Sequence, residues 1–299
     1  MATTVNLEGL IQDYINAHRD EIIAEVPTQS KTVSYMYGMY GVKHKEAVPK
    51  LDSTVVLGDG SACGWAPSGT DIYTNVVIEV NPAEVEKEIC QRDFETTNLN
   101  HELRWAAGQE KLPFAEAYIN SQLAAINEAI EHDVWQGNAT VGLAGLLAQV
   151  ASAVTTAMTV TFTSAMTAED KVNAIVEKVP HKALKYGVDI FLSYSDFAAY
   201  AKAVNATCCA NRNILDASAE SYTLPENSKI RLIPVEGLEG TGKMVAAPAQ
   251  ALVYGTDVEG SENIVDFWFD RKDAKFLFRV LFMIGTALRR PDMVVLGQA

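Results

Sequence analysis

Cysteine is scarce in this 299-residue chain, and the scarcity excludes two kinds of protein. The four cysteines, Cys63, Cys90, Cys208 and Cys209, are scattered, and no C-x-x-C pair occurs. A disulfide scaffold needs a dense cysteine framework, and a structural zinc site usually contains C-x-x-C. We therefore expect reduced thiols that pack as small apolar groups.

Long apolar runs are also lacking. The longest candidate, residues 140–160, is interrupted by Gly142, Gly145 and Gln149, so it falls short of the ~18 apolar residues that a membrane span needs. The N-terminus has no basic segment followed by an apolar run, as a signal peptide would have. We expect a chain that folds in the cytoplasm and does not enter a membrane.

Positive charge is in the minority. The chain has 24 Lys and Arg against 38 Asp and Glu, which gives a formal net charge of −14. A protein that grips nucleic acid does so mainly through Lys and Arg on phosphates, so such binding is not expected. The charge remains compatible with a protein that encloses DNA, because such a protein needs only to avoid binding the DNA tightly.

One apparent nucleotide-binding motif is incomplete. The sequence from Gly237 to Lys243 fits G-x-x-x-x-G-K, but Met244 stands where the motif has a magnesium-binding Ser or Thr. Glu239 would also bring negative charge into the phosphate cradle, and Pro248 disfavours a following helix. We predict a glycine-rich turn.

Other catalytic and metal motifs are missing. Glu128, Glu131 and His132 lie close together on a predicted helix, but the Glu-x-x-His spacing of carboxylate-bridged metal sites is absent. No G-x-S-x-G nucleophile elbow occurs. We expect no catalytic residue, cofactor or metal, and we interpret the three residues as a solvated or interface-facing polar stripe.

The order of predicted elements is informative. Apolar residues at helical spacing predict a helix over 7–26, and a second, long one over 113–136 that Gly137 terminates. The segment from Pro82 also has a helical character. Between the helices over 7–26 and 113–136 lies a long segment, residues 43–70, which is rich in Gly, Ser and Asp. We interpret it as an extended arm or hairpin. Further elements are a helix from a capping box at 167–170, a strand at 188–194, a helix opened by Ser195 and Asp196, a strand at 229–235, and an aromatic hairpin over 264–284.

This order resembles the major capsid proteins of tailed bacteriophages, whose Hong Kong 97 fold is shared with encapsulins. The most family-like stretch runs from Phe114 through Trp135 and Gly137 to the Gly-Leu loop at 142–147. It is similar to the family's spine helix leading into its axial domain. The resemblance implies an α+β fold with an N-terminal arm or helix (1–30), an extended E-loop region (31–75), a peripheral domain with the spine helix (76–137), an axial α/β domain (138–250) and return strands of the peripheral domain (251–299).

The resemblance also implies a function in assembly. Hexamers and pentamers would form an icosahedral shell around phage double-stranded DNA, enclosed without sequence-specific binding, in a virion assembled in the host cytoplasm. Expected partners are further copies of the chain, a portal, a separate scaffolding protein and a decoration protein. The candidates for contact between subunits are Lys43, Lys45, Lys50, Trp65, Glu128, Glu131, Arg271 and Lys272.

Two readings remain open beside the phage capsid. An encapsulin shares the fold but encloses enzymes, and a cytoplasmic α/β enzyme would assemble its site from distant residues. Some family members crosslink a loop Lys to a neighbour's Asn. The lysines are present here, but the sequence identifies no catalytic carboxylate or partner Asn, so we do not expect crosslinking.

Overall fold

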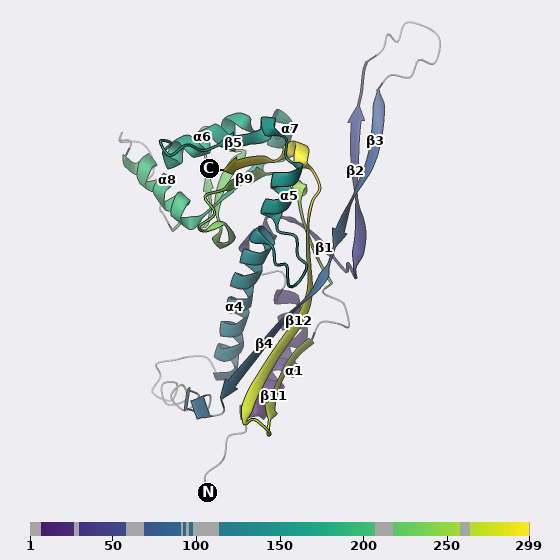
Figure 1. Cartoon of the computed structure of the whole chain (residues 1–299), viewed down its shortest axis with the longest axis vertical. Helices are drawn as coiled ribbons and strands as arrows, with labels where there is room; N and C mark the ends of the chain where they lie inside the picture. Colours follow the sequence, from purple (N-terminus) through teal and green to yellow (C-terminus); the bar gives the residue numbers. More distant parts are fainter. Residues whose placement is uncertain are drawn as a thin grey trace.

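The computed structural model describes residues 7–26, 30–57, 69–90, 92–93, 96–97, 114–206, 218–257 and 264–298. These residues form two bodies, each built on its own sheet, and a long two-stranded hairpin that projects away from both (Figure 1). We refer to the two bodies as the peripheral body and the axial body.

The peripheral body contains a five-stranded sheet. Its strands are β1 (Tyr37–Tyr40), β4 (Asn81–Cys90), β10 (Leu252–Thr256), β11 (Ile264–Asp270) and β12 (Lys275–Leu288). The order is β1-β10-β12-β11, with β4 also paired to β12. Only β1 and β10 run parallel in this set. The predicted aromatic hairpin is confirmed as β11 and β12.

Two helices cover this sheet, α1 (Leu7–Glu25) and α4 (Phe114–Gln136). Ile11 and Ile15, one turn apart on α1, are fully buried. On α4, the ring of Tyr118 makes edge contacts with Phe267 and Phe278 at 6.0 and 6.2 Å between centroids. The alternate residues of β11 and β12 that face these helices belong to a large apolar cluster, which continues through α4 and α5 to strands of the axial body.

The long helix is confirmed as α4, which has 23 residues and is therefore about 34 Å long. It ends where the sequence predicts. Gly137 adopts a φ of +84°, the left-handed conformation that closes helices, and its N–H donates to the Asp133 carbonyl at 2.8 Å.

The axial body contains a six-stranded sheet of order β5-β13-β9-β6-β8-β7. Its strands are β5 (Thr159–Thr161), β6 (Val188–Leu192), β7 (Tyr222–Thr223), β8 (Ile230–Pro234), β9 (Met244–Ala247) and β13 (Val295–Gln298). The helices here are α5 (Leu146–Ala153), α6 (Ala168–Lys178), α7 (His181–Leu184) and α8 (Tyr194–Ala206). The described chain as a whole also has five short helical turns, which are not confined to this body: α2 (Lys31–Ser34), η1 (Thr156–Met158), η2 (Glu236–Leu238), η3 (Ala249–Ala251) and η4 (Pro291–Met293).

Helix starts in the axial body follow local hydrogen bonding. The predicted capping box opens α6, with Thr167 and Asp170 each bonding the other's backbone N–H. The start of α8 differs by two residues from the expectation, because the Ser193 hydroxyl, rather than Ser195, accepts the Asp196 N–H at 3.1 Å.

The helical character expected from Pro82 is wrong, since this segment is strand β4. Glu84, Glu86 and Glu88 alternate on its exposed face, where Lys275 pairs with Glu88 at 2.7 Å and Arg279 pairs with Glu84 and Glu86. This cross-strand charge pattern has a period of two, so pairing with β12 overrides the helix propensity of Glu and Lys.

The end of the chain also differs from the expected division. Strands β10, β11 and β12 return to the peripheral sheet, but β13 crosses to the axial sheet, where it lies between β5 and β9. Likewise β1, inside the expected E-loop region, is a peripheral strand beside β10. The peripheral sheet therefore combines strands from opposite ends of the chain, and the axial sheet takes its strand β13 from the C-terminal end.

Candidate assembly surfaces

The projecting hairpin consists of β2 (Lys45–Thr54) and β3 (Thr70–Glu79), paired antiparallel from Lys45↔Glu79 to Thr54↔Thr70. Ten residues per strand span about 34 Å. The sequence predicted an extended segment over 43–70, and the structure carries its second strand on to Glu79. Figure 1 shows the hairpin rising from the peripheral body and extending past the axial body.

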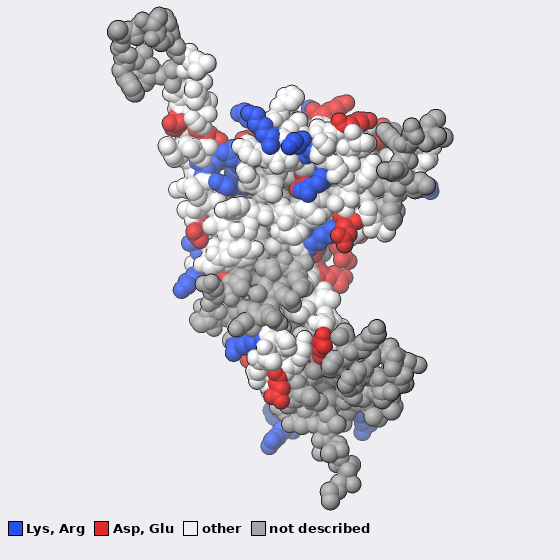
Figure 2. All heavy atoms as spheres, turned by 180° about the vertical axis from the view of Figure 1, so that it is seen from behind, with Lys and Arg blue, Asp and Glu red and all other residues white. Residues whose placement is uncertain are grey.

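Large apolar side chains are exposed along this hairpin and just beyond β2. They are Leu51 (48% exposed), Val55 (78%), Leu57 (93%), Ile72 (55%), Tyr73 (77%) and Val77 (58%), with Val56 also exposed. The hairpin strands also carry charged residues, and in the view from behind uncharged surface alternates with charged groups along the hairpin (Figure 2). A lone two-stranded hairpin is only marginally stable in water, so this one needs cover from another surface.

The root of the hairpin is firmly built. Val48 of β2 and Ile78 of β3 are buried against Val42, Val253 and Met283 in a separate small core. The hairpin therefore starts from a packed base.

Two arginines after β12 hold the outer edge of β2. Arg289 donates from Nε and Nη2 to the Pro49 carbonyl at 3.1 and 2.7 Å, and Arg290 donates to the Leu51 carbonyl at 3.0 Å. Guanidinium groups are rigid and multidentate, so these bonds fix the direction in which the hairpin leaves the body.

Lys50 joins this root network. Its Nζ lies 3.0 Å from Asp52 and 3.2 Å from Asp292, and its side chain is 16% exposed. Partial burial alone would lower the pKa of Lys50, but its bonds to the two carboxylates outweigh that and raise it. The bond from Lys50 in turn lowers the pKa of Asp52. Lys50 is therefore a charged, engaged structural residue at the root of the hairpin.

The other loop residues expected at contacts are placed differently. Lys45 pairs with Glu79 at 3.1 Å across the root, and Lys43 is exposed. Trp65 lies outside the described residues. Arg271 and Lys272 are exposed in the turn between β11 and β12, at the end of the peripheral body far from the hairpin (Figure 1).

The expectation that Glu131 faces solvent or a neighbouring subunit is wrong, because its carboxylate faces into its own subunit. It is 5% exposed, accepts the N–H of Thr32 at 3.0 Å, and bonds the hydroxyls of Ser30 and Thr32. The indole N–H of Trp135 donates to the Thr32 hydroxyl at 2.8 Å. This buried cluster ties α2 to α4, so Glu131 holds the segment leading to the hairpin instead of facing a neighbour.

Glu128, one turn earlier on α4, is exposed and lies beside η2. Burial, followed by the charges of Glu128 and Glu131, raises the pKa of Glu236. Within the described ranges, no group of three or more His, Cys, Asp or Glu is arranged to hold a metal. The described helices include none long and apolar enough to cross a membrane.

The glycine-rich turn is a packing element. Gly237 sits against α4 so closely that a Cβ there would clash with the Glu131 carbonyl oxygen and the Trp135 ring, and its own carbonyl accepts from Gln136 at 3.1 Å. A strand, β9, follows this turn where a phosphate-binding loop would have a helix. The glycine thus serves the junction between α4 and the axial body.

Comparison with known proteins gives a match in structure alone. No family model matches the sequence, and no curated protein is significantly similar to it. Among solved structures, a chain of the satellite phage P4 procapsid, determined with its size determination (Sid) protein, matches over 99% of this chain and 97% of its own, with a TM-score of 0.65 and 9% identity.

Two further matches come from other kinds of particle. A chain from the capsid of the empty GTA particle matches at a TM-score of 0.55 and 12% identity, over 90% of each chain. The holo-SrpI encapsulin complex of Synechococcus elongatus matches at 0.55 and 12%, over 91% of this chain and 88% of that one. Because these matches run nearly end to end, the chain has the Hong Kong 97 fold that phage capsid proteins share with encapsulins.

Proposed function

We propose that this chain is the major capsid protein of a tailed bacteriophage, which assembles into hexamers and pentamers of an icosahedral shell around double-stranded DNA. The observation that carries the proposal is the hairpin β2–β3. Its strands are about 34 Å long, including a packed root, and they expose apolar side chains that the described part of the subunit leaves uncovered.

A neighbouring subunit is the natural cover for such a surface. We propose that the hairpin lies on a different part of the neighbour. Such a contact is head-to-tail, and a head-to-tail contact that closes makes a ring. Shell strength then comes from many moderate contacts of this kind, which is why no catalytic arrangement is required.

The charge of the chain suits a wall around DNA. A net charge of −14 disfavours adhesion of the inner surface to phosphates, so DNA is enclosed without sequence-specific binding. Exposed Lys43, Arg271 and Lys272 are candidates for contacts between neighbours, together with Trp65 and Glu128. A portal, a separate scaffolding protein and a decoration protein complete the proposed partners, in a virion assembled in the host cytoplasm.

Sedimentation of the purified chain, over a range of protein and salt concentrations, tests the proposal. We expect fast-sedimenting species that negative-stain microscopy shows as rings or closed shells. A single slow species of monomer or dimer size under all conditions would favour an enzyme instead.

An encapsulin is the second candidate, because the encapsulin match is as good as the GTA capsid match. The two differ in cargo. Particles isolated from the native source should contain nuclease-protected DNA if the chain is a phage capsid protein. An encapsulin would instead hold a defined cargo protein and no protected DNA.

A further inference from the structure

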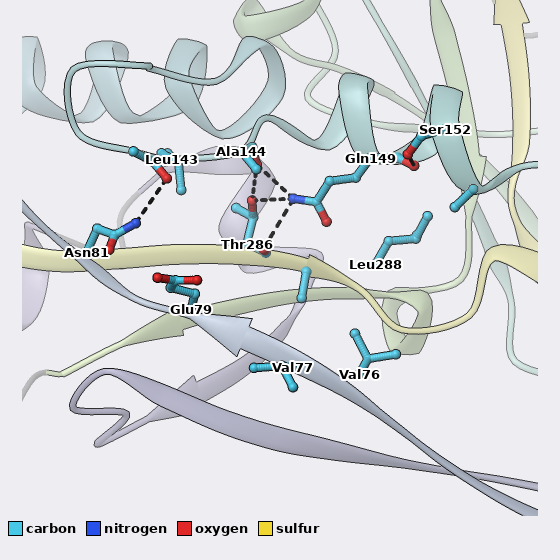
Figure 3. A pocket seen from close by; sticks show the side chains of 13 residues that line it. Val76, Val77, Glu79, Asn81, Leu143, Ala144, Gln149, Ser152, Thr286 and Leu288 are labelled. Carbon is cyan, nitrogen blue, oxygen red and sulfur yellow. Dashed lines mark hydrogen bonds between the residues drawn. The ribbon is translucent and has the colours of Figure 1, made fainter.

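A cleft of about 390 Å³ lies where the hairpin joins the body (Figure 3). One wall is the root of β3, including Val77 and Glu79, and the facing wall is α5 with Gln149 and Ala153. The end of β12 and residues 142–144 complete the cleft.

The facing wall is held rigidly. The Gln149 amide donates to the Ala144 carbonyl at 2.7 Å and to the Thr286 hydroxyl at 3.0 Å, and the Thr286 hydroxyl donates to Ala144. Asn81 donates to the Gly142 carbonyl at 3.0 Å (Figure 3). The cleft is therefore preformed.

The wall made by β3 is an open strand edge. Arg289 and Arg290 reach the carbonyls of Pro49 and Leu51, so those two residues direct their backbone groups away from β3. In an antiparallel pair their partners, Asn75 and Tyr73, also point outward, and Val77 continues the alternation. Within the described chain, β3 has β2 as its single strand partner.

The two edges of the hairpin differ in whether their outward backbone groups can pair with another strand. The β2 edge is closed to a further strand, because Pro49 has no N–H and two arginines occupy its carbonyls. Among the described residues, the outward groups of β3 from Tyr73 to Val77 have no such block, whereas the Glu79 carbonyl lies against Gly285 of β12. Val76 and Val77 form a wall of the cleft. An open edge beside a preformed cleft is the arrangement that accepts an extended peptide as an added strand.

We propose that this cleft binds the segment Val55–Leu57 of a second copy of the chain, as a strand added to β3. The segment follows β2 directly, is uncharged, and exposes Val55 at 78% and Leu57 at 93%. The segment cannot reach the cleft of its own subunit, because the hairpin holds it about 30 Å from the root of β3, where the cleft lies. The inference rests on the proposed shell function and names the partner of the hairpin.

Each subunit then offers a hairpin end and a root cleft, so the same contact repeats from copy to copy. The backbone bonds to β3 set the register, and apolar side chains lining the cleft, such as Val76 and Leu288, cover the incoming valine or leucine.

Disulfide trapping tests this contact. In assembled particles, the double variant Leu57→Cys with Ala153→Cys should give a ladder of covalent multimers on oxidation, reversed by a reductant. Each single variant controls for pairing with native thiols such as Cys90. Leu57→Cys with Lys178→Cys, which places the second thiol on exposed α6, should give no ladder beyond the single variants.

A backbone variant separates strand addition from mere proximity. Val77→Pro removes an outward N–H and leaves the β2–β3 ladder intact, as Pro49 does on the other strand, whereas Val77→Thr keeps the N–H. We expect Val77→Pro to lower the trapping yield by about tenfold and Val77→Thr to leave it unchanged. Melting temperatures of both variants report whether each subunit is folded.

The outcomes distinguish the two proposals. Normal particles without the ladder would overturn the cleft contact and leave the shell function standing. Equal trapping in the proline and threonine variants would overturn strand addition. If the wild-type chain forms no particles or rings under any condition, both proposals fail.

Discussion

At the scale of residues, the most informative side chain is Glu131, a buried carboxylate that bonds donors from Ser30 and Thr32. Its pattern in the sequence, beside Glu128 and His132 on a polar helix face, is that of a solvated stripe. The partners lie about a hundred positions earlier in the chain, so local spacing could not indicate them.

Glu131→Ala should lower the free energy of unfolding by about 3 kcal/mol, because it leaves buried donors without an acceptor. Glu128→Ala, one turn away and exposed, is the matched control and should change it by less than about 0.5 kcal/mol. Urea denaturation of both variants measures the difference. Equal effects would mean that the cluster does not hold α2 to α4.

Gly237→Ala should also destabilise the subunit, by about 2 kcal/mol, because the added methyl group meets α4 at the Glu131 carbonyl and the Trp135 ring. Gly240→Ala meets no atom within 4 Å and should cost about half as much, from its φ of +72° alone. Thermal unfolding compares the two. If Gly237→Ala is the milder variant, the close packing of η2 on α4 is wrong.

At the scale of elements, strongly periodic segments could be predicted and charged ones could not. The long helix, the capping box at Thr167 and the aromatic hairpin follow from local pattern, and the structure confirms each. Strand β4 could not be predicted from local pattern, because its glutamates form ion pairs with Lys275 and Arg279 on β12, which lies far along the chain. The extended segment was predicted, but its root network of Arg289, Arg290 and Lys50 depends on folding.

The hairpin should be separable from the body that carries it. Asp52 and Ile72 lie directly opposite each other, so replacing residues 53–71 by an Asn-Gly turn shortens the hairpin without disturbing its root. We expect a subunit with near-normal circular dichroism and melting temperature that forms no closed shells. Normal shells from this variant would refute the role of the hairpin in assembly.

At the scale of the whole molecule, the order of segments predicted the fold even though identity to the matched structures is 9–12%. The order of elements can still be read at such low identity, because the projecting hairpin, the long helix and the closing strands each have a distinct residue pattern in the sequence. The pairing of β13 with the axial sheet could not be predicted, because a strand of four residues is too short for its sequence pattern to indicate which sheet it joins. The contacts between subunits are likewise a property of the assembly.

The central claim is that the chain closes into a shell through its hairpin, and a three-dimensional reconstruction of assembled particles by electron cryo-microscopy tests it most directly. The account predicts an icosahedral shell of six- and five-membered rings in which each hairpin leaves its own subunit and lies on a neighbour. Particles in which the hairpin folds back on its own subunit, or a chain that stays monomeric or dimeric in every condition, would contradict it.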